Sequence, residues 1–109
     1  MEELLKTFRK EDIDEPIVAS FDPVINKTRL ISYQGDMYIT PTKVYLLPRS
    51  EADMAAYYPK CIAISEIDSW KKYGLAGFQF NFKDGSQQLF SNVGRKMREG
   101  IIAAIEAQK

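Results

Sequence analysis

The sequence has no histidine and a single cysteine, Cys61. Histidine is the usual general base near neutral pH and, with cysteine, the commonest ligand of zinc and other transition metals. A lone cysteine also cannot form a disulfide within the chain. We therefore expect no catalytic residues, no metal site and no cofactor, and we expect that the protein is not an enzyme.

The sequence also lacks an excess of charge of either sign and any long apolar run. Its 15 lysines and arginines balance 15 aspartates and glutamates, whereas a protein that binds nucleic acid by neutralising phosphates normally carries a basic excess. No stretch approaches the roughly 20 apolar residues that cross a bilayer, and the first residues, MEELLKTFRKED, are too acidic and polar for a signal peptide. We expect no nucleic-acid partner and a cytoplasmic location.

What the sequence does contain is an ordinary globular composition. Of its 109 residues, 45% are hydrophobic, 28% charged and 12% aromatic, which is enough apolar material for one hydrophobic core. We found no repeats, low-complexity tracts or linkers along the chain. These features predict a single domain over residues 1–109.

From Pro16 to Phe90 the pattern is typical of β-strands, with short runs of Val, Ile, Tyr and Phe broken by turn residues. The run FQFNF at 78–82 places three phenylalanines on one face, predicted to be core, and two amides on the other, predicted to be solvated. Asp84-Gly85 follows and predicts a hairpin with a type I′ turn into residues 87–91.

Pro41 lies within Thr40-Pro41-Thr42 and cannot donate to a strand ladder, so it predicts a second hairpin between residues 36–39 and 43–47. Residues 60–65 alternate through Ile62 and Ile64, but Ile67 is an odd number of residues further on. Ile67 reaches the core only if the strand has a bulge or a corner before it, and we expect that break.

Two helices flank the strands in this interpretation. A short N-terminal helix is expected to end near Lys10, before the acidic cluster that leads to Pro16. Ser91 or Asn92 is expected to cap a C-terminal amphipathic helix, whose Gly100 suggests close approach to a sheet. The predicted core comprises Phe78, Phe80, Phe82, Val44, Leu46, Ile62, Ile64, Met97, Ile101 and Ile105.

The predicted fold class is therefore mainly β (α+β), a partly open barrel of six or seven antiparallel strands capped by the C-terminal helix. Three segments within Gly35 to Ile105 carry a resemblance: GDMYITPTKVYLL at 35–47, IAISEIDSWKK at 62–72 and FKDGSQQLFSNVGRKMREGI at 82–101. Together they resemble the GRAM domain, a member of the pleckstrin-homology (PH) superfold, in a free-standing, bacterial-type form. The resemblance implies a PH-like barrel with a binding or scaffolding role and no catalysis, and related free-standing bacterial domains can assemble.

The remaining chemically active side chains have ordinary structural explanations. Glu66 and Asp68 lie two apart and would share one face of a strand, as paired carboxylates require, but a solvated outer face explains them better. Lys60 is next to Cys61, yet neighbours on a strand point to opposite faces and no base is available, so Cys61 is expected to be a packed core residue. Trp70 is either core or an anchor at the rim of the barrel.

Three basic residues are the candidate ligand-binding residues. Lys27 and Arg29 lie in the first long connection, and Arg49 opens the connection over residues 49–59. In PH-like domains the corresponding loops can form a headgroup site, as the resemblance implies. Because Asp22 and Asp36 lie close in sequence and the alternating basic signature is absent, we expect at most weak binding of phosphoinositide or other anionic lipid.

A set of apolar side chains is the alternative functional surface. The narrow face of the N-terminal segment is too short to form a stable helix alone, so it must dock on the body of the protein or on another chain. The 49–59 connection is unusually apolar for an exposed loop. The candidate protein-contact residues are Leu4, Leu5, Phe8, Met54, Tyr57 and Tyr58. We expect a protein partner or a homo-oligomer first, and a lipid headgroup as the alternative.

Overall fold

The computed structural model describes residues 2–5 and 7–109. Within them it contains nine strands: β1 (Glu2–Leu4), β2 (Ala19–Phe21), β3 (Val24–Asn26), β4 (Ser32–Ile39), β5 (Lys43–Pro48), β6 (Lys60–Ala63), β7 (Ile67–Tyr73), β8 (Gly77–Phe82) and β9 (Gln87–Ser91). The α-helices are α1 (Glu51–Tyr57) and α2 (Arg95–Gln108), and single 3-10 turns form η1 (Lys10–Asp12) and η2 (Ile64–Glu66).

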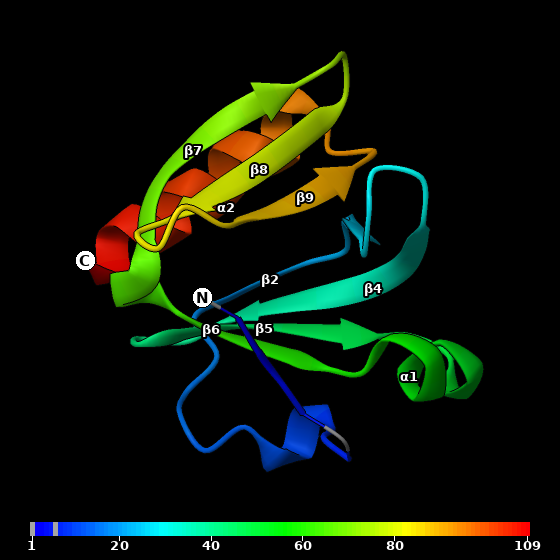
Figure 1. Cartoon of the computed structure of the whole chain (residues 1–109). Helices are drawn as coiled ribbons and strands as arrows, with labels where there is room; N and C mark the ends of the chain where they lie inside the picture. Colours follow the sequence, from blue (N-terminus) through cyan, green and yellow to red (C-terminus); the bar gives the residue numbers. More distant parts are fainter. Residues whose placement is uncertain (1, 6) are drawn as a thin grey trace.

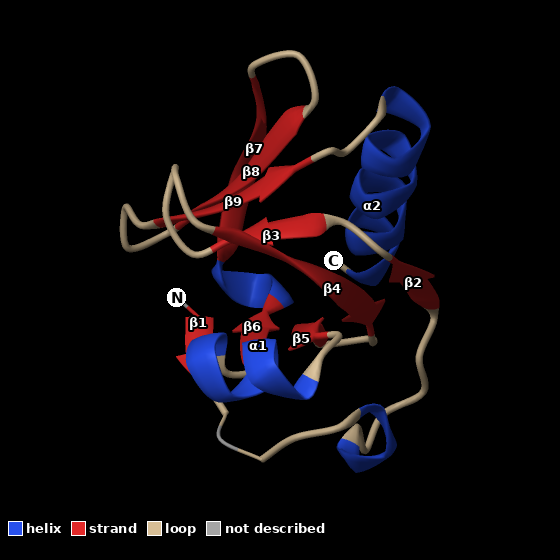
Figure 2. Ribbon diagram, turned by 90° about the vertical axis from the view of Figure 1, so that its right-hand side faces the viewer, coloured by secondary structure: helices blue, strands red, loops and turns tan. Residues whose placement is uncertain are grey.

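All strand pairs are antiparallel, in the order β1-β6-β5-β4-β3-β9-β8-β7, and β2 also pairs with β4. Figure 1 shows the sheet folded into two layers, with β7, β8 and β9 above and β4, β5 and β6 below. Helix α2 packs along the upper layer (Figure 2). The predicted barrel of antiparallel strands with a C-terminal helix is confirmed. The strand count is higher than expected because the segment that pairs with β4 on one side is divided into two short strands, β2 and β3, and because β1 is added.

Both predicted hairpins are present, but one turn differs from its prediction. Of the two central residues of Asp84-Gly85, only Gly85 has a positive φ, of 89°. The N–H of Gly85 donates to the Phe82 carbonyl at 3.0 Å, and the N–H of Phe82 donates to Ser86 at 2.9 Å. This is the three-residue hairpin in which a type I turn is followed by glycine in a bulge, rather than a type I′ turn.

The expected break before Ile67 is confirmed. The 3-10 turn η2 makes a corner between β6 and β7, and the pairing of β7 with β8 shifts register between Ile67 and Ser69. As a result Ile67 is buried although it is an odd number of residues from Ile64. The corner passes the chain from the lower layer to the upper one (Figure 1).

The core lies between the two layers and under α2. The predicted core residues are buried except Met97, which is half-buried and packs against the cluster. Phe78, Phe80 and Phe90 meet ring to ring at centroid distances of 5.0 to 6.0 Å. On the opposite face of β8 one prediction is wrong: Gln79 is buried rather than solvated. Its side-chain amide donates to the Asn81 side-chain oxygen at 2.7 Å on the same face.

Helix α2 begins later than predicted. Ser91 ends β9, Asn92 has a positive φ of 52°, and the N-cap residue is Gly94, whose cap has no side-chain hydrogen bond. The predicted close approach at Gly100 is confirmed, because a Cβ there would lie 2.9 Å from a ring carbon of Phe21 on β2.

The N-terminal helix is the main correction. Residues Glu2–Leu4 form strand β1 instead, paired with β6, and Leu5 donates its N–H to the Pro59 carbonyl at 2.7 Å. Among the described residues of this segment, helical geometry is limited to the single turn η1. A two-turn helix is unstable alone, whereas the edge of β6 offers partners for the backbone of an extended chain. Long-range pairing thus overrides the local pattern.

Candidate binding surfaces

The loop between β3 and β4 carries two of the candidate basic residues and is held by its own hydrogen bonds. The Thr28 hydroxyl accepts the backbone N–H groups of Leu30 and Ile31 at 3.2 and 3.0 Å. The Lys27 N–H donates to the Ile31 carbonyl at 2.9 Å. Asn26 anchors the base of the loop, since its side-chain amide donates to the Thr28 carbonyl at 3.1 Å.

The cationic groups of this loop lie over aromatic rings. The Lys27 ammonium is 5.5 Å from the ring centre of Tyr57, and the Arg29 guanidinium is 5.4 Å from that of Tyr73. Tyr73 ends β7, which is separated from β3 in the sheet by β9 and β8. The two residues therefore engage different parts of the protein through cation–π contacts.

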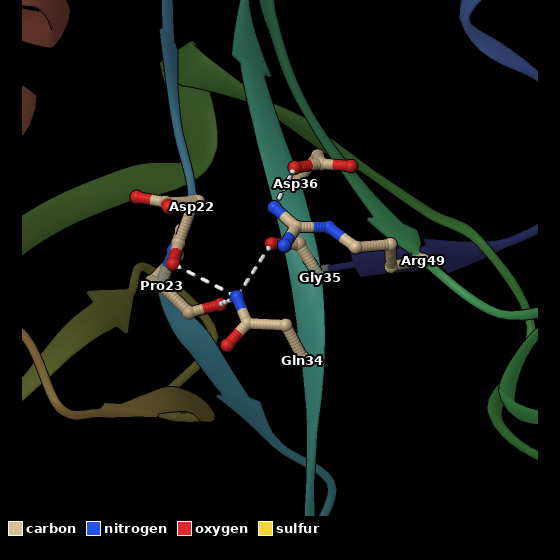
Figure 3. A network of polar contacts seen from close by, with 6 residues as sticks. All are labelled: Asp22, Pro23, Gln34, Gly35, Asp36 and Arg49. Atoms are coloured by element: carbon tan, nitrogen blue, oxygen red, sulfur yellow. Dashed lines mark hydrogen bonds and ion pairs between the residues drawn. The ribbon is translucent and has the colours of Figure 1, made fainter.

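Arg49 is committed to an ion pair. Its guanidinium lies 2.7 Å from a carboxylate oxygen of Asp36, and this hydrogen bond raises the pKa of Arg49 above its usual value. Figure 3 shows Arg49 directed at Asp36, with Gln34 beside it. The Gln34 amide donates to the carbonyls of Asp22 at 2.9 Å and Gly35 at 3.2 Å. The three candidate basic residues thus contact three different side chains. Lys27 contacts Tyr57, Arg29 contacts Tyr73 and Arg49 contacts Asp36.

A cavity of about 440 Å³ lies beside Lys27. It is lined by Leu4, Lys27, Ala56, Tyr57, Tyr58 and Lys60. Lys60 is only 5% exposed, and its ammonium donates to the Gln88 side chain at 3.2 Å. The sequence interpretation did not select Lys60, although it lies two residues from the inward-facing Ile62 and that spacing places it inside the barrel.

The 49–59 connection forms helix α1 rather than an open loop. Ser50 caps it by accepting the Asp53 N–H at 3.0 Å. Tyr57 stacks on the buried Tyr33 at a centroid distance of 4.6 Å, and Met54 is half-buried. Tyr58 follows with a positive φ of 58° and is 39% exposed. Of the three candidate contact residues in this segment, Tyr58 is the most accessible.

The N-terminal candidate contact residues likewise divide into half-buried and exposed side chains. Leu5 and Phe8 are half-buried against a second apolar cluster on the outer face of the lower layer, where Phe8 stacks on Tyr45 at 5.2 Å. Burial, reinforced by neighbouring Cys61, raises the pKa of Tyr45 to about 12. Leu4 is 58% exposed at the mouth of the 440 Å³ cavity. Most of this apolar face therefore docks on the body of the same chain.

Strand β7 presents the other exposed surface. It is one end of the sheet, and among residues 2–5 and 7–109 it pairs only with β8. Five of its residues, Asp68 to Lys72, are exposed in succession. Trp70 is 44% exposed and lies 6.0 Å from the Phe78 ring, so it is at the rim of the barrel rather than in the core.

The side chains with catalytic chemistry are not brought together. Glu66 lies in the corner η2, while Asp68 is at the bulge of β7, so they do not share a regular strand face. Cys61 is buried, as expected of a packed cysteine. Within the described residues no cluster of three metal-ligating side chains forms, and none of the described helices combines the length and apolarity needed to cross a membrane.

Comparison with known proteins supports the fold through structure and not through sequence. No protein-family model matches the chain, and no curated protein matches it. The C-terminal domain of an unknown protein from Leishmania infantum has a TM-score of 0.69 at 17% identity, over 86% of this chain and 84% of that one. The two are therefore of similar size and share one architecture.

The linker-DH/PH domains of p115-RhoGEF are also similar. One crystal structure matches with a TM-score of 0.69 at 13% identity over 93% of this chain, and an N-terminally truncated form matches with 0.68 at 11% over 87%. This chain spans only 31% and 29% of those structures. At such identities the likeness shows the fold alone, which is PH-like.

Proposed function

We propose that the chain is a non-enzymatic binding module that recognises protein, and that its partner is a second copy of the same chain. The PH-like fold, in which the chemically active side chains lie apart from one another, supports a binding role. Within that fold we assign the chain to the GRAM type, on the three sequence segments quoted above.

The observation that carries the proposal is the engagement of the basic residues by the protein itself. Arg49 pairs with Asp36, and Lys27 and Arg29 each lie over a tyrosine ring. An anionic headgroup would have to compete with each of these contacts. Exposed apolar side chains, in contrast, remain at Leu4, Tyr58 and Trp70. A formal net charge of zero adds little repulsion between copies.

Sedimentation equilibrium of the full chain tests this proposal. We expect a concentration-dependent mass above the 12.5 kDa of one chain. Because apolar contacts are screened little by salt, raising the ionic strength should not abolish association. A mass of 12.5 kDa at every concentration up to several hundred micromolar would refute self-association. The paired variant Leu4→Asp with Tyr58→Asp then tests whether the contact lies beside the 440 Å³ cavity.

A headgroup site is the second candidate, and one observation favours it. The 440 Å³ cavity is lined by the ammonium-bearing side chains Lys27 and Lys60. We nevertheless expect little sedimentation with vesicles containing phosphatidylserine or phosphoinositide at physiological salt, since the chain is neutral overall. Strong binding that is lost in the Lys27→Glu, Arg29→Glu variant would promote the lipid function over the protein one. Lys96→Glu on exposed α2 changes the net charge as much as either single reversal, and it is the charge control for Lys27→Glu and for Arg29→Glu tested separately.

A further inference from the structure

The first part of the chain lies outside the barrel, and we call its residues 2–5 and 7–13 the N-terminal arm. None of these residues belongs to the main core between the two layers. The arm instead packs on the second apolar cluster, on the outer face of the lower layer; the residues involved are Leu5, Phe8 and Ile13 of the arm and Tyr45, Leu47 and Cys61 of the sheet. Figure 2 shows the chain passing beneath that layer between β2 and β1. The main core is therefore complete without the arm.

The surface beneath the arm is unfavourable to expose. Strand β1 pairs with the edge of β6, and the Leu5 N–H donates to the Pro59 carbonyl at 2.7 Å. Without the arm this edge would present unpaired backbone groups, and Tyr45 and Cys61, which are 4% and 7% exposed, would face water. An unpaired edge beside an apolar patch readily takes up another strand. A body that releases its own arm therefore captures a replacement, and the segment that fits is the arm of a second copy.

A very short connection joins the arm to the body. Ile13 is the last arm residue that packs on the outer cluster. Two positions later the Glu15 carboxylate accepts the hydroxyls of Thr40 and Thr42 at 2.9 and 2.5 Å, which fixes Glu15 to the turn between β4 and β5. Only Asp14 therefore separates the arm from a fixed point on the body. Rotation of the backbone at Asp14 moves the whole arm while the barrel keeps its own contacts.

From this arrangement we infer that two copies of the chain exchange their N-terminal arms, each arm adding its β1 to β6 of the other copy. The inference rests on the proposed self-association and assigns its interface. Exchange remakes every contact that the arm makes within one chain, so it is a low-cost route to a dimer. It competes with the arm's own body, at an effective concentration of about a millimolar for a short tether. Contacts that only the dimer makes must therefore favour it.

The connection itself supplies such contacts. Ile13 and Glu15 are two residues apart and span at most about 7 Å. In the exchanged dimer the Glu15 of each copy thus lies within that distance of the arm site on the other copy, and the two Glu15 residues lie within twice that distance of each other. Ile17 and Val18 follow directly, and 37% and 47% of their surfaces are exposed in the single chain. The exchanged dimer brings these apolar side chains against their counterparts and buries them.

Charge at the connection gives the dimer a particular salt dependence. Exchange brings Asp14 and Glu15 of one copy close to Asp14 and Glu15 of the other, and like charges repel. Added salt screens that repulsion between exposed carboxylates. We therefore expect the association constant to rise with the concentration of NaCl, and a fall would contradict exchange.

The register of β1 on β6 provides a direct test, because Glu3 lies opposite Cys61, the single cysteine of the chain. Opposed Cα atoms of antiparallel strands are about 4.5 to 5.5 Å apart, which is within the range of a disulfide. The test mixes the unaltered chain with the variant Glu3→Cys, Cys61→Ser, so that each chain has one cysteine. With oxidised glutathione, a disulfide between position 3 of one chain and Cys61 of the other forms only if the arm of the first lies on β6 of the second.

Mass spectrometry of the tryptic peptides identifies this disulfide. It should form at several hundred micromolar protein and fall about tenfold or more at a few micromolar, because the arm's own body then competes better. The matched control is Lys96→Cys with Cys61→Ser, which places an exposed cysteine on α2 away from the arm. Mixed with the unaltered chain, it should give about a tenth of the cross-link or less.

The same position can lock the arm. Glu3→Cys with Cys61 retained, oxidised at a few micromolar, should form the disulfide within one chain. The locked chain should stay at 12.5 kDa in sedimentation equilibrium, and reduction should restore association. Ile17→Ser should lower the association constant about tenfold or more, because the dimer buries this side chain in both copies. Leu75→Ser, which replaces a fully exposed leucine between β7 and β8, should have no effect.

The outcomes separate this inference from the proposed function. A monomer of the unaltered chain at all concentrations would refute both self-association and exchange. An oligomer that the locked chain still forms, or one without the disulfide between position 3 and Cys61 of different chains, would refute exchange and leave self-association standing. The disulfide between chains, together with loss of association on locking, would establish the exchanged dimer.

Discussion

Replacing Phe80 by alanine is the sharpest test of the fold. Phe80 is 1% exposed and sits at the middle of β8. Its ring meets Phe78 at 5.4 Å and Phe90 at 5.0 Å, both edge to face. Truncating a buried phenylalanine costs about 3 to 5 kcal/mol, and each aromatic pair contributes about 0.5 to 1.5 kcal/mol. We therefore expect a loss of unfolding free energy of about 4 to 5 kcal/mol.

Equilibrium unfolding in urea, followed by circular dichroism and by Trp70 fluorescence, measures that loss. A domain of this size has about 5 to 15 kcal/mol in total, so Phe80→Leu is a milder second variant in case the alanine variant does not fold. Phe8→Ala is the matched control, because Phe8 is half-buried and stacks on one ring only. It should cost about 1 to 2 kcal/mol. A loss below about 1 kcal/mol at Phe80 would mean that β8 has the opposite face inward.

Three further predictions concern the pH dependence of stability and the space around glycine residues. Hydrogen bonding from Thr42 lowers the pKa of Glu15 from 4.5. Glu15 therefore adds stability above pH 4.5, and this stability is lost as the pH falls through its lowered pKa. Glu15→Gln should make the free energy of unfolding depend less steeply on pH in this acidic range. The pKa of Tyr45 is raised to about 12, chiefly by burial, so its contribution is complete below pH 10 and is lost as the pH rises from 10 to 12. Tyr45→Phe should reduce that alkaline loss in urea titrations, and an unchanged slope would contradict the assignment. A Cβ on Gly77 would fall on the Tyr73 backbone carbonyl, so Gly77→Ala should lower the melting temperature, whereas Gly94→Ala, which has open space, should not.

The parts of the fold that sequence alone predicted are those that local chemistry fixes. Proline in Thr40-Pro41-Thr42 and glycine in Asp84-Gly85 set both hairpins, and the alternation of the Phe78 to Phe82 run set the inward face of β8. The odd spacing to Ile67 required a corner, and η2 provides it. In each case a few neighbouring residues contain the information.

The parts that failed depend on contacts between distant segments. The apolar residues Leu4, Leu5 and Phe8 fit a helical face, yet backbone partners on β6, more than fifty residues away, make the segment a strand. Gln79 alternates correctly with its neighbours, yet it is buried on the face of β8 that the alternation predicts to be solvated. Neither the pairing of the N-terminal segment with β6 nor the burial of Gln79 can be predicted from a few neighbouring residues.

The candidate surfaces follow the same rule, and this favours the proposed binding of protein over the binding of lipid. The basic residues Lys27, Arg29 and Arg49 were selected because their loops are adjacent in a PH-like fold, but each finds a partner on its own chain that is remote in sequence. Strand β7 contacts Lys109 at the Ile67 carbonyl and Arg29 at Tyr73, but within the described residues it pairs with no strand other than β8. A binding function placed on residues already engaged must displace existing contacts, whereas one placed on β7 only adds contacts.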